Sequence, residues 1–239
     1  MSDSGSAEPL REKAPAGLHD FCEELIDKYV ERSAQILDIA AGTGALARRL
    51  RKKGYARVAA NDLDATAFAA PEVSFTRVDL NTAFSQDLGR QRWDAILAVE
   101  IIEHLDNPLA FLRECGNMLK EGGYLLVTTP NILGSESLLQ WLRRGHFLYF
   151  SPAWYRSLRH VSLLPAWLLD AKAVESGVDV VYRGFTPRVR PRDSAGKLHA
   201  GLRCAALTCL DLALRAFGRS KAEATGANYI ILCRRQRGH

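Results

Sequence analysis

The sequence of 239 residues lacks the patterns of an exported or membrane-spanning protein. It has no run of 18 or more apolar residues, which excludes an ordinary transmembrane helix. Residues 1–17 are rich in Ser, Gly, Pro and charge, and they contain no apolar segment of the kind found in signal peptides. We therefore predict a disordered leader over residues 1–17 and a cytoplasmic protein.

Cysteine pairs and metal-ligand spacings are also absent. The five cysteines are odd in number, and no two of them form a C-x-x-C pair. They are Cys22, Cys115, Cys204, Cys209 and Cys233. This scatter argues against a disulfide framework or a structural zinc site, and we expect reduced thiols.

Charge is unevenly distributed along the chain. Residues 183–239 hold 12 Lys and Arg against 3 Asp and Glu, a formal net charge of +9, whereas residues 1–182 carry −4. A basic segment of this kind attracts phosphorylated substrates, nucleic acid or anionic lipid, and it is equally typical of a solvated surface. The charge pattern alone therefore leaves the partner open.

Length and periodicity predict one α/β domain over residues 18–239. A chain of 239 residues with 47% apolar content suits one large domain and is too short for two comfortable ones. Short β-rich runs alternate with helical stretches, which is typical of a parallel sheet with helices on both faces. We expect seven strands near 35–40, 56–61, 73–78, 93–99, 123–129, 178–183 and 227–233, and helices near 18–31, 44–53, 107–120, 134–144, 151–158, 165–176 and 198–217.

A glycine-bearing turn follows the first expected strand. Residues 36–44 read ILDIAAGTG and lead into a helix-forming run. Gly42 and Gly44 have no Cβ, so the backbone can approach a ligand closely, and the following helix offers free N–H groups. Asp62 ends the next apolar run, where an acid can bind ribose hydroxyls. The dinucleotide fingerprint is incomplete because Ala47 replaces its third glycine, so we predict a different nucleotide-like cofactor.

The turn resembles the first motif of class I S-adenosylmethionine-dependent methyltransferases, D/E-x-G-x-G-x-G. It runs here from Asp38 to Gly44, with Ala40 in place of the first glycine. The resemblance implies S-adenosylmethionine as cofactor, Asp79 as the acid near the adenine, and a Rossmann-like sheet whose last strand is antiparallel. The residues that it implies for cofactor binding are Asp38, Ala40, Gly42, Thr43, Gly44, Asp62, Leu63, Asp79, Leu80, Val99 and Glu100.

Two later segments narrow the resemblance to one branch of these enzymes. Residues 93–108 contain an E-x-x-E-H sequence formed by Glu100, Glu103 and His104, and residues 122–131 read GGYLLVTTPN. Both are similar to a branch that includes quinone-biosynthesis O-methyltransferases and methyltransferases of glycans and small metabolites. The resemblance implies methyl transfer to a hydroxyl of a small-molecule, sugar or lipid-like acceptor, and it does not favour nucleic acid as a partner.

His104 is the first candidate for catalysis. It follows the fourth expected strand, and ligands of open α/β sheets bind at the carboxyl ends of the strands. A neutral imidazole can accept a proton from an attacking hydroxyl, and it can equally fix the loop, because methyl transfer needs chiefly alignment and desolvation. Residues 131–165 are rich in aromatics and histidine, so we place the acceptor pocket and its lid there, with His160 as second candidate and His146 as a further one.

A metal-dependent alternative rests on the same histidines. An E-x-x-E-H sequence with a downstream histidine also resembles the metal-binding set of small-RNA 3′-terminal 2′-O-methyltransferases. Glu100, Glu103 and His104, with His146 or His160, would then hold a divalent cation. Our preferred interpretation has no metal, because the region 146–160 lacks clustered histidines.

Two further questions stay open at this level. The domain could serve as a non-catalytic interaction module, although retention of Asp38, Asp62 and Asp79 argues against this interpretation. Segment 198–217 is strongly apolar, with polar residues on about half of a helical wheel. We favour a packed helix there; the other interpretation is a helix that contacts the membrane surface or covers an apolar acceptor such as a lipid-linked sugar or quinone. The oligomeric state is undetermined.

Overall fold

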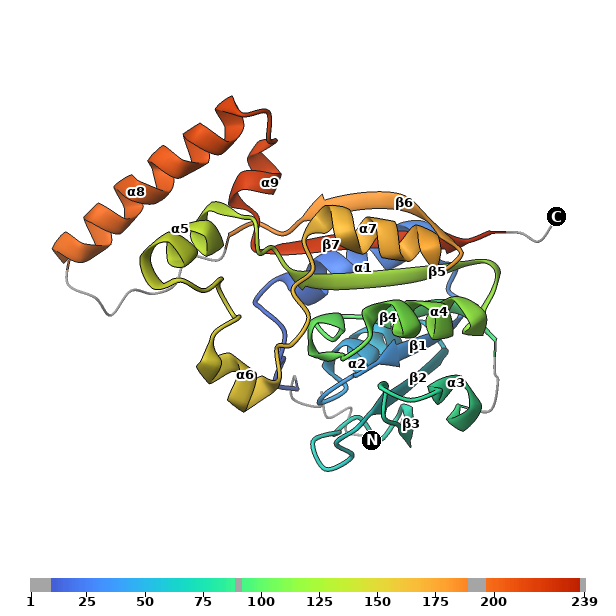
Figure 1. Ribbon diagram of the computed structural model, residues 1–239. Coiled ribbons are helices and arrows are strands. Elements are labelled where there is room, and N and C mark those ends of the chain that lie inside the picture. The colour runs from blue at the N-terminus through green and yellow to red at the C-terminus, as the bar shows by residue number, and fades with distance from the viewer. Residues whose placement is uncertain (1–9, 89–91, 189–196, 237–239) are drawn as a thin grey trace, which may run out of the picture.

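A seven-stranded sheet forms the centre of the molecule. The computed structural model describes residues 10–88, 92–188 and 197–236, and the strand order is β3-β2-β1-β4-β5-β7-β6. The strands are β1 Gln35–Ile39, β2 Arg57–Asp62, β3 Ser74–Arg77, β4 Trp93–Ala98, β5 Leu119–Pro130, β6 Val178–Phe185 and β7 Asn228–Arg235. Figure 1 shows the sheet running through the body of the protein.

The pairing confirms the predicted fold class. Strands β1 to β5 are mutually parallel, and β7 lies antiparallel between β5 and β6. The chain therefore starts in the middle of the sheet, extends to one edge and then returns through β4 to the other. This reversal lies between β1 and β4, and such a switch point is where open α/β sheets bind ligands.

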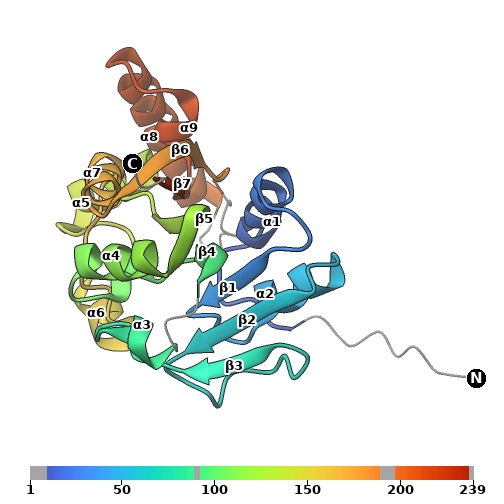
Figure 2. The ribbon, with the colours of Figure 1, turned by 90° about the vertical axis from the view of Figure 1, so that its right-hand side faces the viewer.

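Helices cover both faces of the sheet. In Figure 2, α1 and α2 lie on one side of the sheet, and α4 and α7 lie on the other. The helices are α1 Leu18–Tyr29, α2 Ala45–Lys52, α3 Phe84–Asp87, α4 Pro108–Met118, α5 Ser135–Arg144, α6 Pro152–Leu158, α7 Ala166–Glu175, α8 Lys197–Ala216 and α9 Lys221–Thr225, with a 3-10 turn η1 at Ile102–His104. The short α3, η1 and α9 had no counterpart in the sequence prediction, because segments of three to five residues carry no periodicity.

Alternation along the strands separates two apolar cores. Leu37 in β1 and Ile96 in β4 point to the core beneath α4 and α7, whereas Ile36 and Leu97 point to the core beneath α1 and α2. Side chains of successive strand residues lie on opposite faces, so each strand contributes to both cores. The central strands are consequently near-continuous apolar runs, as the sequence indicated.

Helices α5, α6 and α8 stand apart from these layers. They lie at the end of the molecule where β5 ends, and α8 projects from the body beside α5 (Figure 1). Among the residues that the structure describes, no helix is both long enough and apolar enough to cross a bilayer. All five cysteines are free thiols, in agreement with the sequence.

Candidate functional site

The glycine turn joins β1 to α2 at the switch point of the sheet. Gly42 and Gly44 have φ values of 56° and 80°, and Ala40 has a φ of 57°. A Cβ on Gly44 would lie 2.6 Å from the Phe68 ring and 2.8 Å from Ala70. Glycine is thus required at position 44 by both backbone angle and space. The alanine that departs from the family motif occupies the same left-handed region at higher cost.

Two acids brace this turn from the strands beside it. Asp38 is buried, and its Oδ2 accepts a hydrogen bond from the Ala47 N–H of α2 at 3.1 Å. Burial raises the pKa of the Asp38 carboxyl to about 7. Asp62 accepts from the Gly42 N–H at 2.8 Å through Oδ2 and from the Asp64 N–H at 2.9 Å through Oδ1. Each Asp62 oxygen keeps a second lone pair for a ligand hydroxyl.

An N-terminal strap, residues 10–16, crosses the glycine turn. The Thr43 hydroxyl donates to the Arg11 carbonyl at 2.8 Å, and a Cβ on Gly42 would lie 3.3 Å from the side chain of Lys13. Arg49 of α2 donates to Glu12 of the strap at 2.6 Å. Leu10 and Ala14 of the strap pack against the core beneath α1.

The strap revises part of the sequence interpretation. Residues 10–17, which the sequence assigned to the leader, are held by packing and by the turn, while residues 1–9 lie outside the described residues. The polar composition of this segment suggested disorder. Its ordered contacts could not be predicted locally, because they join the strap to residues about 30 positions away. Lys13 is consequently a candidate ligand-binding residue that sequence reasoning missed.

The remaining predicted cofactor residues line the same edge. Asp79 is exposed, and its Oδ1 accepts from the Asn81 N–H at 2.9 Å, an Asx turn directly after β3. Leu63 is 56% exposed beside Asp62, whereas Leu80 is buried in the core. Val99 follows β4 and is partly buried. Asp79 and Leu63 are thus open to a ligand, whereas Leu80 packs inside the core.

Glu100 and Glu103 form a pair of shielded carboxyls after β4. Glu100 accepts from the Thr128 hydroxyl at 2.8 Å and from the Asn228 amide at 2.7 Å, and burial raises its pKa to about 7. Glu103 is 1% exposed and accepts from the Thr129 hydroxyl. Burial and the neighbouring Glu100 raise the pKa of Glu103 well above its ordinary value. The groups that donate these hydrogen bonds are all neutral, so none of them offsets the negative charge of the carboxyls. Protonation of at least one of the two carboxyls removes the repulsion between them.

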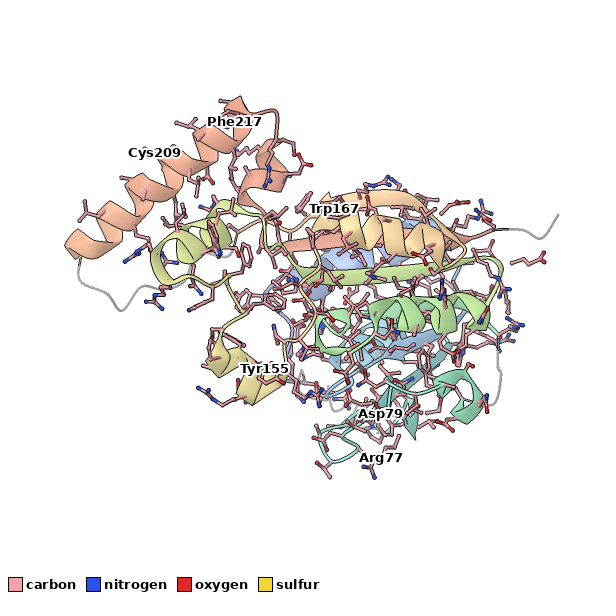
Figure 3. The ribbon with its side chains drawn as sticks, in the orientation of Figure 1. Arg77, Asp79, Tyr155, Trp167, Cys209 and Phe217 are labelled. Carbon is pink, nitrogen blue, oxygen red and sulfur yellow. The ribbon has the colours of Figure 1, made fainter. Side chains whose placement is uncertain are left out.

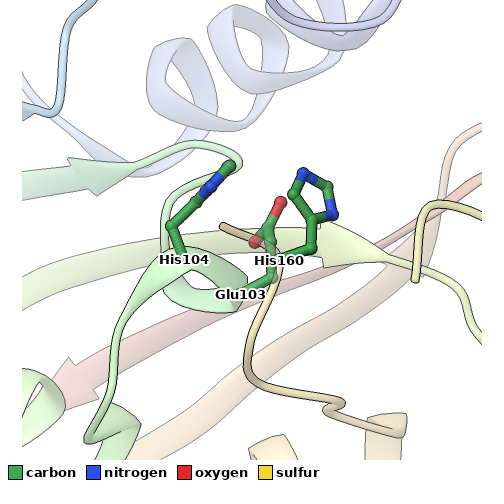
Figure 4. A group of neighbouring side chains, drawn as sticks. All are labelled: Glu103, His104 and His160. Carbon is green, nitrogen blue, oxygen red and sulfur yellow. The ribbon is translucent and has the colours of Figure 1, made fainter. Parts of the chain in front are cut away.

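His104 and His160 lie on either side of the Glu103 side chain, as Figure 4 shows. Their ring centroids are 4.5 Å apart in an edge-on arrangement. The Nδ1 of His104 lies 2.5 Å from the Leu158 carbonyl, which can only accept, so Nδ1 carries the proton and Nε2 carries the lone pair. Burial lowers the pKa of His104 below 6.5, and burial together with His104 lowers that of His160 to about 4. Both rings are neutral at neutral pH.

Backbone hydrogen bonds bring His160 to this place from 56 residues along the chain. The Glu103 carbonyl accepts from the N–H groups of Val161 and Ser162, at 2.9 and 3.0 Å. The Ser162 hydroxyl donates to the Leu105 carbonyl at 2.6 Å, and Arg159 pairs with Asp106 at 2.9 Å. The segment after α6 is thereby fastened to η1, a long-range contact that no local pattern encodes.

Aromatic rings close the space around His160. The rings of Phe150 and Trp154 each lie 5.4 Å from the His160 ring, and Tyr149 lies 5.1 Å from Trp154. His160 Nδ1 is buried and has no hydrogen-bond partner among the residues that the structure describes. An orphaned polar atom in an apolar wall is typical of a surface that a ligand completes.

Backbone strain gathers at the same site. In the described residues, four positions other than glycine have positive φ, and all four lie at the turn, after β4 or in the lid. They are Ala40, Glu100, Tyr149 and Arg159. Strained residues persist where surrounding structure fixes them for function.

Glu103, His104 and His160 also offer one ligand atom each within 4.8 Å of one another, a set that could hold a divalent cation. This trio differs from the set expected for the metal-dependent alternative. Glu100 turns to Thr128 and Asn228, and His146 lies beside Gln140 at 3.2 Å. Neither belongs to the trio.

Comparisons with known proteins fit this geometry. The family described as a methyltransferase domain matches residues 10–175 of this chain. A ubiquinone biosynthesis O-methyltransferase of Bradyrhizobium is 32% identical over 210 residues, which are 77% of this chain and 79% of that protein. One of Parvibaculum lavamentivorans is 34% identical over 46% of this chain, and the alignment spans about half of the relative, 49%.

The solved structures share the fold. The structure of a SAM-dependent methyltransferase from Archaeoglobus fulgidus superposes with a TM-score of 0.61, covering 91% of this chain and 94% of that chain, at 15% sequence identity. At that identity the likeness concerns architecture alone.

Proposed function

The chain belongs to the class I S-adenosylmethionine-dependent methyltransferases, and we propose that it transfers a methyl group to a hydroxyl of a small-molecule, sugar or lipid-like acceptor. The oxygen as target is supported by the O-methyltransferase relatives and by the neutral His104, which follows β4, the strand paired with β1. The acceptor class is supported by the aromatic wall around His160.

The residues at the glycine turn fit the cofactor. A Cβ at position 44 would collide with Phe68 and Ala70, so glycine keeps the turn closely packed, and the exposed Asp79 and the free lone pairs of Asp62 face outward for a ligand. Asp62 would bind the ribose hydroxyls through its remaining lone pairs, and Asp79 would face the adenine amino group. Lys13 of the strap would pair with the carboxylate of the methionine portion. Bound there, S-adenosylmethionine supplies an electrophilic methyl group on a sulfonium that leaves as a thioether.

One observation supports the reaction most strongly: the hydrogen bond from His104 Nδ1 to the Leu158 carbonyl. It fixes the tautomer, so that Nε2 is an acceptor with a defined direction. The acceptor hydroxyl would donate its proton to Nε2 as its oxygen forms the new bond to carbon, and His104 would become an imidazolium. Glu103, close by, would stabilise that cation once it is ionised.

His160 and the aromatic rings complete the acceptor side. The unpartnered Nδ1 of His160 offers a hydrogen bond that would orient the acceptor. Phe150 and Trp154 would exclude water, which favours alignment and keeps the developing charges unscreened.

Calorimetric titration of the purified chain with S-adenosylmethionine and S-adenosylhomocysteine tests the cofactor, with NAD as the control ligand. Micromolar binding of both sulfur ligands and none of NAD supports the proposal. Transfer of labelled methyl groups to a panel of catechols, sugars and polyprenyl phenols then tests the acceptor. The variant His104→Ala should retain cofactor affinity and lose most transfer, whereas failure of the wild type to bind either sulfur ligand would support the non-catalytic alternative.

Assays with added metal distinguish our proposal from the RNA-directed alternative. The same titrations and transfer assays would be repeated with magnesium or manganese and with a short RNA. Transfer to the RNA 3′ end that depends on the metal would replace our proposal, and transfer that is unchanged by a chelator would exclude the alternative.

A further inference from the structure

One face of α8 is apolar and exposed along its described length. Its members recur every three or four residues and so form a single stripe. The stripe comprises Leu202, Ala205, Cys209, Leu212 and Ala216, and Phe217 extends it beyond the helix end. Leu202, Leu212 and Phe217 are 66%, 57% and 89% exposed. Exposed apolar groups arranged in a continuous stripe mark an interaction surface.

The charged residues of α8 lie mainly on the opposite face. Arg203 pairs with Glu136 of α5, and Asp211 pairs with Arg188 at 3.0 Å. Leu207 is buried on that same face. The side of α8 that packs against α5 is therefore the one opposite the stripe, and the stripe stays exposed. Figure 3 marks Cys209 and Phe217 along this projecting helix.

Basic residues lie beside the stripe and on the side of α8 that faces α5. A groove of about 620 Å³, including its open mouth, lies between α5 and α8 and is lined by Arg143, Arg144 and Arg203 with one acid, Glu136. Arg215, next to the stripe, is exposed. From position 137 to position 169, the sequence contains four arginines and no acid. The α5–α8 pair is therefore predominantly basic, with Arg215 at the edge of the stripe and the groove arginines on the side of α8 that faces α5.

Exposed aromatic side chains lie on two further helices. Trp141, on the neighbouring α5, is 47% exposed, and Tyr155, on α6 farther from α8 (Figure 3), is 57% exposed. Tryptophan and tyrosine concentrate where a protein meets the headgroup region of a bilayer, because their rings are apolar and their tips are polar.

From these observations we propose that α8, with the basic end of α5, docks on the surface of an anionic phospholipid bilayer. The stripe would lie in the boundary between headgroups and acyl chains, parallel to the membrane plane. Arg215 at the edge of the stripe would contact lipid phosphates, while Arg143 and Arg144 would add electrostatic attraction to the anionic surface from the end of α5. This mode requires no membrane-spanning segment.

Charge favours a bilayer over a second copy of the chain. Two copies joined through the stripe would be related by two-fold symmetry and would bring their exposed arginines close together. Like charges oppose such pairing, whereas anionic headgroups neutralise them. The docked surface lies at the same end of the molecule as the lid, α5 and α6 (Figure 1), which would bring a lipid-like acceptor near the site.

Vesicle binding tests this proposal without any acceptor or cofactor, so its outcome is separate from that of the proposed function. The full chain would be sedimented with vesicles of phosphatidylcholine alone or mixed with phosphatidylglycerol. We expect binding only to the mixed vesicles, and a loss of roughly tenfold or more when salt is raised from about 50 mM to about 500 mM.

Matched substitutions locate the surface. Leu212→Glu on the stripe should weaken vesicle binding roughly tenfold, as should the double variant R143A/R144A, because one removes apolar burial and the other removes charge. Val174→Glu is the control, since Val174 of α7 is 56% exposed, close to the 57% of Leu212, and lies away from the stripe. It should bind as the wild type does. Circular dichroism confirms that each variant is folded.

An environment-sensitive fluorophore on Cys209, in a Cys204→Ser background, reports directly on the stripe, because the other three cysteines are buried. Blue-shifted emission on mixed vesicles is expected. Absence of vesicle binding, equal binding to neutral vesicles, equal loss in the Val174→Glu control, or a dimer that Leu212→Glu dissociates would each overturn the proposal.

Discussion

The backbone N–H of Gly42 donates a hydrogen bond to the carboxylate of Asp62, with 2.8 Å between the nitrogen and Oδ2. Asp62 thereby holds the glycine turn in the conformation that a ligand meets, in addition to any bond that it makes to the ligand itself. The acid at the end of β2 and the turn after β1 form one unit, because their strands are adjacent and parallel.

Substitution of Asp62 should weaken cofactor binding more than loss of one ligand contact would. In Asp62→Ala both the ribose acceptor and the brace at Gly42 are lost, and we expect the Kd for S-adenosylhomocysteine to rise about 10- to 100-fold. Calorimetric titration measures it. Asp64→Asn is the control: Asp64 is an exposed neighbouring acid, and its substitution should leave the Kd nearly unchanged. Equal affinities of wild type and Asp62→Ala would contradict the assignment.

The strap should slow the escape of a bound ligand. Glu12→Gln weakens the ion pair that holds the strap to Arg49, so we expect faster dissociation of S-adenosylhomocysteine, by roughly three- to tenfold, and faster amide exchange over residues 10–16. Asp20→Asn removes another partner of the same arginine without touching the strap. If both variants release ligand at the same rate, the effect belongs to Arg49 and not to the strap.

The two histidines should titrate at low pH and influence each other. NMR titration of the ring protons should give a midpoint below 6.5 for His104 and of about 4 for His160. Because the His104 charge lowers the pKa of His160, His104→Asn should shift the His160 midpoint upward. His146→Asn should not. A His160 midpoint at or above 6.5 in the wild type would show that the ring is not enclosed as the structure has it.

Stability should depend on pH through Asp38. Its pKa is about 7 in the fold against 3.8 unfolded, so the folded state binds more protons between these values. The contribution of Asp38 is therefore complete at about pH 4 and is lost as pH rises through about 7, at most ~4 kcal/mol in the free energy of unfolding. In Asp38→Asn this contribution should be absent, while those of the buried carboxyls Glu100 and Glu103 remain. Urea denaturation of both proteins from about pH 4 to about pH 8 compares them, and parallel pH profiles would disprove it.

The sequence by itself determined the sheet and the cofactor edge. Each strand is an apolar run between turn residues, several of the main helices have an amphipathic period, and the glycines of the turn and Asp38 are local in the chain. Local periodicity and spacing suffice for such features, since the physical constraints that they satisfy, burial of one face and a left-handed backbone at a tight turn, act within a few residues.

Only the tertiary structure decided how the acceptor side is assembled. His160 meets His104 because the Glu103 carbonyl binds the backbone of Val161 and Ser162, and Glu100 is held by Asn228 from the last strand. The strap likewise reaches the glycine turn through contacts with Thr43 and Arg49. These bonds join residues from about 30 to 128 positions apart, and chain entropy makes them dependent on the whole fold. No periodicity records them, so the meeting of side chains from separate elements appears only once the sheet has brought the elements together.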